Sequence, residues 1–309
     1  MATTASAAGL RMRLLRWFGD HGRASLPWRT VRSPYRTLVS EFMLAQTQVD
    51  RVVPRFEAFV ERFPDFASLA NAPLADVLRE WKGLGYNSRA VRLHRLARAV
   101  VDDHGGALPS GAAALRSLPG VGPYTLAAIR TFAFNLDDAP VDTNVRRIVH
   151  RLFFGIEHPR AAAAAQLDER ARSLVPRDRA HDWNSALMDL GALLCTARAP
   201  KCLRCPLRGD CRAAPLDATA LELARAANAR RAPAQEAIPF EQSRRYARGR
   251  IIDQLRALPA GQRISLLDLT LAMQSQLPGR SSAELREVVA ALERDGLISS
   301  DAGGVALHE

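Results

Sequence analysis

The chain has 309 residues, of which 43 are Lys or Arg and 32 are Asp or Glu, so its formal net charge is +11. A charged fraction of 24% and a hydrophobic fraction of 48% are ordinary for globular proteins and exclude wholesale disorder. No apolar run approaches the roughly 18 residues of a membrane span, and the first ten residues lack the pattern of a secretory signal. We therefore expect a cytoplasmic protein of two or three domains, whose positive charge favours a polyanionic partner such as nucleic acid.

Helical periodicity dominates the first 215 residues. Apolar side chains recur three and four positions apart in the stretches 69–80, 90–101 and 125–134. Prolines are expected to separate short helical segments at Pro27, Pro34, Pro54, Pro64, Pro73, Pro109 and Pro119. This part of the chain is thus predicted to be a mainly α bundle.

The rest of the chain predicts a linker and a separate small module. Residues 216–235 are rich in Ala and Arg and read as a linker or a surface helix. Three helical stretches follow at 244–258, 265–275 and 281–297, and then a β-hairpin over 298–308 that turns at Gly303-Gly304. That order is typical of a winged helix-turn-helix.

The positive charge is confined to the front of the chain. Residues 236–309 carry nine basic and ten acidic side chains, a net charge of −1, so residues 1–235 carry +12. A local basic cluster lies at Arg244, Arg245, Arg248 and Arg250. Because the module as a whole is not basic, we expect it to pack against protein rather than to grip DNA strongly.

The segment Leu118-Pro-Gly-Val-Gly122 predicts a tight turn between two helices. Backbone N–H groups of such a turn, aided by the dipole of the next helix, can bind one phosphate without reading sequence. Some twenty residues later, Asp142 in Pro140-Val-Asp-Thr-Asn144 precedes a helical segment over 145–153. It can be a helix N-cap, or a carboxylate that stabilises a cationic sugar, as in glycoside hydrolysis.

The four cysteines of the chain form one tight cluster, C-x6-C-x2-C-x5-C, made of Cys195, Cys202, Cys205 and Cys211. Such spacing in a long chain points to a metal site rather than to a disulfide scaffold. Physical chemistry alone leaves both tetrahedral zinc and a [4Fe–4S] cluster open. Either would make the intervening loop rigid and could present its basic residues to phosphates: Arg198, Lys201, Arg204 and Arg208.

In this order, the hairpin, the aspartate and the cysteine cluster resemble the helix-hairpin-helix DNA glycosylases of the endonuclease III and MutY superfamily. The resemblance runs from about residue 26 to 212 and narrows to the MutY branch through four segments: Leu26-Pro-Trp-Arg29, Ser40-Glu-Phe-Met-Leu-Ala-Gln-Thr-Gln-Val49, Gly83-Leu-Gly-Tyr86 and Met188-Asp-Leu-Gly-Ala192. It implies two helical domains with DNA bound between them, an N-terminal helix packed on the metal-bearing domain, and [4Fe–4S] on the cysteines. The implied boundaries are 1–27 with 141–215 for the cluster domain, 28–140 for a six-helix domain, 216–235 for the linker and 236–309 for the winged-helix-like module.

The resemblance also implies the chemistry of the site. Glu41, otherwise a surface helix residue, would be the catalytic acid, and Asp142 would stabilise the oxocarbenium ion and form a transient covalent link. Tyr124 and Asn144 would support the two carboxylates. Bifunctional enzymes of the endonuclease III type place a lysine at position 124, whereas the only lysines here are Lys82 and Lys201. The resemblance therefore implies base removal without strand cleavage.

Further residues are expected to contact the duplex. Gln46 resembles an intercalating glutamine and Tyr86 a wedge beside the damaged base, while Trp28 and Arg29 would line the base pocket. The same surface is expected to include Leu44, Ser185, Gly120, Val121 and Gly122. The implied partner is double-stranded DNA with a mismatch or an oxidised base, bound by a monomer in a bacterial nucleoid.

Three departures from the MutY pattern leave alternatives open. Ala45 replaces the first glutamine of a Q-Q-T pair, and Ser185 stands where Gln or Glu commonly contacts the adenine edge. The Nudix-like domain that reads 8-oxoguanine has no counterpart in the chain. The main hypothesis is removal of adenine opposite 8-oxoguanine or guanine. The alternatives are a T:G or U:G mismatch glycosylase and a non-catalytic DNA-binding protein.

Overall fold

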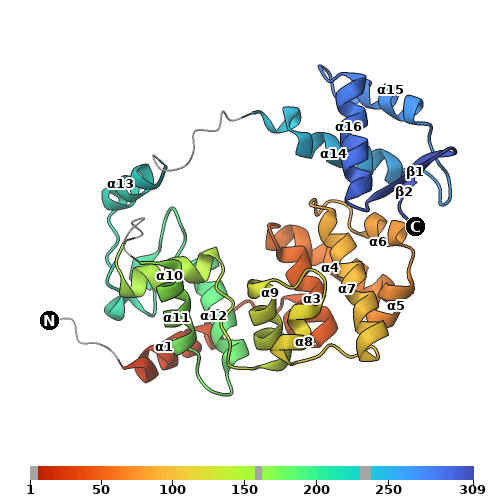
Figure 1. Ribbon diagram of the computed structural model, residues 1–309. Helices are drawn as coiled ribbons and strands as arrows, with labels where there is room; N and C mark the ends of the chain where they lie inside the picture. Colours follow the sequence, from red (N-terminus) through yellow and green to blue (C-terminus); the bar gives the residue numbers. More distant parts are fainter. Residues whose placement is uncertain (1–5, 157–161, 230–237) are drawn as a thin grey trace. The chain divides into compact units, whose positions relative to one another are not determined.

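The computed structural model describes residues 6–156, 162–229 and 238–309, which are mainly helical (Figure 1). The chain divides into two compact units. The first comprises residues 1–38, 110–116 and 121–234, and the second comprises 39–109, 117–120 and 235–309. The mainly α fold is thereby confirmed. Throughout the described ranges, every helix is too short or too polar to cross a lipid bilayer.

Long-range packing builds the first unit from both ends of its sequence. Its helices are α1 (Ala7–His21), α2 (Pro27–Thr30), α9 (Pro123–Ala128), the π-helical η1 (Ile129–Ala133), α10 (Thr143–Phe153), α11 (Ala164–Ser173), α12 (Ala180–Leu193), the 3-10 turns η2 (Cys202–Arg204) and η3 (Arg208–Asp210), and α13 (Ala218–Ala229). The buried face of α1, with Leu10 and Leu14, packs against α12 around Trp183. An N-terminal helix packed on the cysteine-bearing part was expected, and it is found.

Two helices, α3 (Pro34–Leu44) and α8 (Ala112–Ser117), include residues of both units. The remaining helices of the second unit are α4 (Val49–Arg62), α5 (Phe66–Asn71), α6 (Leu74–Glu80), α7 (Ser88–His104), the 3-10 turn η4 (Phe240–Gln242), α14 (Arg244–Arg256), α15 (Leu266–Gln276) and α16 (Ser282–Arg294). Phe56, Phe59 and Trp81 are fully buried among α4, α6 and α7, which explains the strong apolar periodicity there.

The C-terminal module has the predicted winged-helix order. Strands β1 (Ile298–Asp301) and β2 (Gly304–Leu307) pair antiparallel, with Ile298 opposite Leu307, and Ile264 bridges to Val305. The module has a core of its own, formed by Ile251, Ile252, Leu255, Leu269, Met273, Leu285, Val288 and Leu292. Within the second unit, α14 and β2 pack against α6.

Two local expectations are wrong, those at Pro54 and at the turn of the C-terminal hairpin. Pro54 does not end a helix but lies inside α4, where burial of Val52, Phe56 and Phe59 offsets the one backbone hydrogen bond that proline removes. Pro73 separates α5 from α6, as expected, so the periodic stretch 69–80 spans two helices. The hairpin turns at residues 302–303, and Gly304 begins β2. Gly304 has a φ of +116°, and a Cβ there would lie 2.5 Å from the Ile264 carbonyl oxygen, so this position requires a glycine.

Residues 218–229 form the helix α13, so the surface-helix interpretation of residues 216–235 holds for that part. The expected linker residues 230–235, like residues 1–5 and 236–237, lie outside the described residues.

Candidate functional site

Asp142 is the N-cap of α10, and both of its carboxylate oxygens accept hydrogen bonds. Oδ1 accepts from the Val145 backbone N–H at 2.7 Å, and Oδ2 accepts from the Asn144 amide at 2.8 Å. The cap and the expected reactive carboxylate are thus the same group. Because the helix start fixes the side chain, the carboxylate is held in one orientation without a charged partner in the described residues.

The network continues from Asn144 toward the cysteine segment. The Asn144 Oδ1 accepts from Arg147 at 2.8 Å, and Arg147 also donates to the carbonyls of Gly191 at 2.9 Å and Cys195 at 2.7 Å. Gly191 on α12 makes this possible, since a Cβ there would lie only 2.7 Å from the Cβ of Asn144. Close packing of α10 and α12 therefore supports the residue that orients Asp142.

The expected hairpin joins α8 to α9. Gly120 has a φ of +81°, and a Cβ on it would lie 3.3 Å from the Phe42 ring, so a glycine is needed there. Val121 is buried, and Gly122 is the N-cap of α9 with Pro123 at its first position. Tyr124 follows in the first turn of α9 with 38% of its surface exposed.

Helix α3 carries Glu41 and Leu44, both half-buried, in the part that belongs to the second unit. The chain leaves this helix through a turn in which the Thr47 N–H donates to the Leu44 carbonyl at 3.1 Å. Gln46 lies in that turn, exposed, with a φ of +65°. A left-handed backbone costs a non-glycine residue about 1–2 kcal/mol, so the surrounding structure must enforce it.

Tyr86 has the same unusual backbone, with a φ of +45°, and its side chain is 38% exposed. The buried Arg89 lies beneath both turns. Its guanidinium donates to the carbonyls of Phe42, Met43 and Ala45, to the Thr47 hydroxyl, and to the carbonyls of Leu84 and Gly85. Burial lowers the pKa of Arg89 to about 10, which still leaves it charged at neutral pH. One buried cation therefore holds both expected duplex-inserting residues in place.

The four cysteines line one cavity next to Arg151. The Cys211 thiol donates to the Arg151 carbonyl at 3.3 Å, and the Arg151 guanidinium lies 3.5 Å from the Cys195 sulfur. Burial, reinforced by the neighbouring thiols, raises the pKa of Cys205 to about 11. The basic side chains of this loop are exposed: Arg198, Lys201, Arg204 and Arg208.

Arg29 and Ser185 have clear structural surroundings within the first unit. The fully buried Asp189 accepts from Arg29 at 2.8 Å and forms an ion pair with Arg23 at 2.7 Å. Burial opposes ionisation of Asp189, but its bonds to the two arginines prevail and its pKa lies below the ordinary value. Ser185 is 2% exposed on α12, and Trp28 is half-buried on α2. Contact of these residues with a base stays a prediction.

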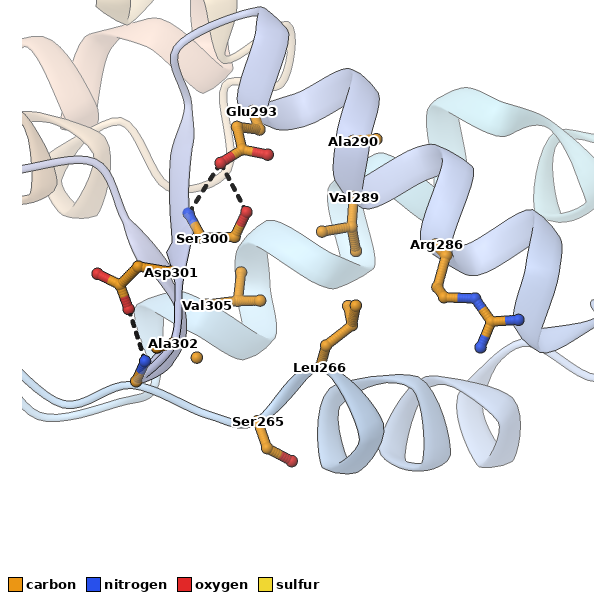
Figure 2. Close-up of a pocket in the computed structure, with 12 residues that line it drawn as sticks. Ser265, Leu266, Arg286, Val289, Ala290, Glu293, Ser300, Asp301, Ala302 and Val305 are labelled. Atoms are coloured by element: carbon orange, nitrogen blue, oxygen red, sulfur yellow. Dashed lines mark hydrogen bonds between the residues drawn. The ribbon is translucent and has the colours of Figure 1, made fainter.

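A separate hollow of about 550 Å³ lies in the C-terminal module, between α15, α16 and the hairpin (Figure 2). Glu293 accepts from the backbone and hydroxyl of Ser300, at 3.0 and 2.6 Å, and Arg286 lies further along α16. The charged lining residues are Arg286, Glu293 and Asp301. With two acidic groups against one basic group, this hollow does not favour a phosphate.

The sequence matches families that repair DNA. Residues 39–173 match the HhH-GPD superfamily of base excision DNA repair proteins, and residues 195–211 match the iron–sulfur binding domain of endonuclease III. The thymine/uracil-DNA glycosylase of Methanothermobacter thermautotrophicus is 35% identical over 195 residues, which cover 63% of this chain and 88% of that protein. The chain belongs to the HhH-GPD superfamily of base excision DNA repair proteins.

Other members of the superfamily are similar over a smaller share of their length. The adenine DNA glycosylase of Mycolicibacterium smegmatis is 45% identical over 63% of this chain, and that of Buchnera aphidicola is 37% identical over 64%. The matches span only 66% and 56% of those two proteins. Among solved structures, a thermostable thymine-DNA glycosylase superposes with a TM-score of 0.61 at 33% identity, covering 66% of this chain and 94% of that one. A non-covalent endonuclease III–DNA complex gives 0.56 at 22% identity, covering 67% and 96%, and supports the same fold.

The cysteines of this HhH-GPD protein form an iron–sulfur binding domain, as expected. Four thiols around one cavity supply the donor set that a [4Fe–4S] cluster requires.

Several residues that organise this HhH-GPD site were not singled out from the sequence. Asp189 and Gly191 lie in a segment that resembles MutY, but their contacts with Arg29 and Asn144 depend on tertiary packing. Arg89 had no signal beyond being an arginine on an apolar helix. The expected roles of Glu41, Asp142 and the other residues toward DNA stay predictions.

Proposed function

We propose that this protein is a monofunctional DNA glycosylase that removes adenine mispaired with 8-oxoguanine or guanine. The observation that carries the proposal is the Asp142 carboxylate, held by the Val145 N–H and the Asn144 amide at the start of α10. Relatives named adenine DNA glycosylase, at 37–45% identity over about 63% of the chain, support adenine as the base.

In the proposed reaction, Glu41 donates a proton to a ring nitrogen of adenine, and the N-glycosidic bond breaks with its electron pair leaving on the base. The Asp142 carboxylate stabilises the oxocarbenium ion and adds to it transiently. Water then attacks the anomeric carbon and displaces Asp142, and its proton returns to Glu41. The products are free adenine and an abasic site.

Residue 124 excludes the lyase step in this proposal. Tyr124 carries no amine that could attack the sugar, and Lys82 and Lys201 are far from it in the sequence. The enzyme therefore leaves the abasic strand intact.

The proposed partner is double-stranded DNA, bound by one copy of the chain. Gln46 and Tyr86, on enforced left-handed backbones, enter the base stack when the adenine is flipped out. A [4Fe–4S] cluster on the four cysteines serves as a structural staple that presents the exposed basic residues of its loop to phosphates. Action on chromosomal DNA would place the protein at the bacterial nucleoid.

One observation favours a second candidate. The thymine/uracil-DNA glycosylase relative is covered over 88% of its length, and a thermostable thymine-DNA glycosylase structure over 94%. Removal of thymine or uracil opposite guanine is therefore the alternative activity.

Single-turnover base release on duplexes containing A:8-oxoguanine, A:G, T:G and U:G tests the proposal. We expect release from the two adenine duplexes, and strand breaks only after treatment with alkali. Release of thymine or uracil alone would establish the second candidate. Spontaneous strand breaks would contradict the monofunctional assignment, and binding without any release would leave a DNA-binding protein.

A further inference from the structure

The C-terminal module contacts the side chain of Tyr86 directly. The guanidinium of Arg245, in the first turn of α14, lies 4.4 Å from the centre of the Tyr86 ring and 5.2 Å from that of Phe240. It also donates a hydrogen bond to the Tyr86 hydroxyl. The cation is thus placed between two aromatic side chains that remain 38% and 51% exposed. This arrangement restrains the Tyr86 ring while leaving it accessible.

The other end of α14 contacts Asn87, the residue that follows Tyr86. Arg256 donates to the Asn87 side chain at 2.9 Å and to the Leu78 carbonyl at 2.8 Å, and it is paired with Asp253 at 2.9 Å. Arg245 and Arg256 are eleven residues apart, which is about three helical turns, so they project from the same face of α14. An arginine near each end of α14 therefore contacts one of the two adjacent residues Tyr86 and Asn87.

The contact matters because the backbone around Tyr86 does not by itself set the orientation of the Tyr86 ring. Arg89 holds the carbonyls of Leu84 and Gly85 and so fixes the chain that leads into Tyr86. The Arg89 guanidinium also lies 5.7 Å from the centre of the Tyr86 ring, but Arg245 lies closer, at 4.4 Å, and donates to the phenol hydroxyl. A side chain that must slide between bases binds better when its orientation is set beforehand, because less rotational freedom is lost on binding.

We propose that Arg245 is a positioning residue, through which the C-terminal module orients the Tyr86 ring for entry into the duplex. This inference rests on the proposed function, in which Tyr86 enters the base stack when the adenine is flipped out. It gives the module a role that does not require a basic DNA-binding face, in agreement with its net charge of −1.

A double-mutant cycle in the full-length protein tests the proposal. The variants are Arg245→Ala, Tyr86→Ala and the two combined, with Arg244→Ala as the matched control. Arg244 is the neighbouring exposed arginine, which forms an ion pair with Glu287 at 3.8 Å. The probe is a duplex with 2'-fluoro-2'-deoxyadenosine, which resists excision, opposite guanine or 8-oxoguanine. A 2-aminopurine beside the opposite base reports unstacking by its fluorescence.

We expect Arg245→Ala to weaken specific binding and reduce the fluorescence change by about five- to tenfold, whereas Arg244→Ala changes both less than about twofold. In the Tyr86→Ala background, loss of Arg245 should have no further effect. Arg245→Lys should resemble Arg245→Ala, because an ammonium keeps the charge but lacks the planar group that stacks. Phe240→Ala should reduce specific binding and the fluorescence change by a smaller factor. It replaces Arg245→Ala as the test variant if Arg245→Ala folds poorly. Iron content and melting temperature should match those of the unmodified protein.

Equal losses in the two arginine variants would overturn the proposal, because charge alone would then account for the effect. Additive losses in the Tyr86→Ala background would also overturn it, as would a gain of binding in Arg245→Ala. The probe needs no base release. A protein that unstacks the probe but releases no adenine would therefore contradict the proposed function. The effect of Arg245→Ala on the fluorescence change could still be measured in that case.

Discussion

The Asp142 segment and the Gln46–Tyr86 segment are held in place by opposite means. Asp142 is oriented by its own helix start and by a chain of side-chain hydrogen bonds through Asn144 and Arg147. Gln46 and Tyr86 owe their placement to backbone carbonyls gathered around the single cation of Arg89. One region fixes a functional group, and the other fixes a loop shape.

The difference follows from what each region is proposed to do. A carboxylate that stabilises a short-lived cation must be placed within a fraction of an ångström, which hydrogen bonds to its own oxygens achieve. Residues that enter a duplex need a backbone projecting from the surface, with side chains left exposed. Strained φ angles of +65° and +45°, enforced from below by a buried arginine, provide that projection.

The largest effect is expected from a substitution of Asp142, which changes only the first of these two regions. Asp142→Asn should lower single-turnover adenine release by on the order of a thousandfold or more, since the amide cannot stabilise the sugar cation. Duplex binding should be kept, because asparagine can still cap α10. Asp137→Asn, at an exposed position nearby, is the control and should be near normal. A rate close to that of the unmodified protein would remove Asp142 from the mechanism.

Substitution of Arg89 should disrupt the turns that hold Gln46 and Tyr86 and leave the hydrogen bonds of Asp142 intact. Arg89→Met would leave several carbonyls of the two turns without their donor, so the free energy of unfolding should fall by about 3–4 kcal/mol. Urea denaturation measures this, with Arg98→Met on the exposed side of α7 as control. Unchanged stability together with unchanged duplex binding would show that Arg89 does not organise the turns.

Asp189 gives the stability of the first unit a dependence on acidic pH. Its pKa is lowered in the folded state, so its stabilising effect is complete above the unfolded value near 4 and is lost as the pH falls through the folded value. Asp189→Asn should cost about 2–3 kcal/mol at pH 7, because two arginines lose their charged partner. The difference in unfolding free energy between the two proteins should stay constant from pH 7 to about 4 and shrink only below that. A gap that closes between pH 7 and 5 would assign the effect to another group.

The smallest expected effect concerns packing behind Asn144. Gly191→Ala should lower the unfolding free energy by about 1–2 kcal/mol, because the added methyl would force α10 and α12 apart. Adenine release should fall with it, since Asn144 orients Asp142. Gly19→Ala on α1, where a Cβ meets nothing within 4 Å, should be neutral or slightly stabilising in the same thermal melts. Normal adenine release together with lowered stability would show that this packing does not contribute to the orientation of Asp142.

Much of this organisation could be predicted from local sequence. The helical periodicity, the glycines of the hairpin and the cysteine spacing each depend on residues close together in the chain, so short-range rules were sufficient. Those rules failed at Pro54, where burial of neighbouring side chains prevailed, and at the turn of the C-terminal hairpin, where the Ile264 backbone approaches Gly304 closely.

The sequence alone determined the superfamily, the iron–sulfur ligands and the tyrosine at position 124, because these depend on which residue stands at a position. Only the tertiary structure decided how they are supported: Arg89 beneath the two turns, Asp189 between Arg23 and Arg29, Gly191 against Asn144, and Arg245 on Tyr86. Each of these contacts joins residues on different elements, most of them far apart in the chain. A periodic pattern shows which side chains are buried, but not which distant partner a buried or exposed charge will find.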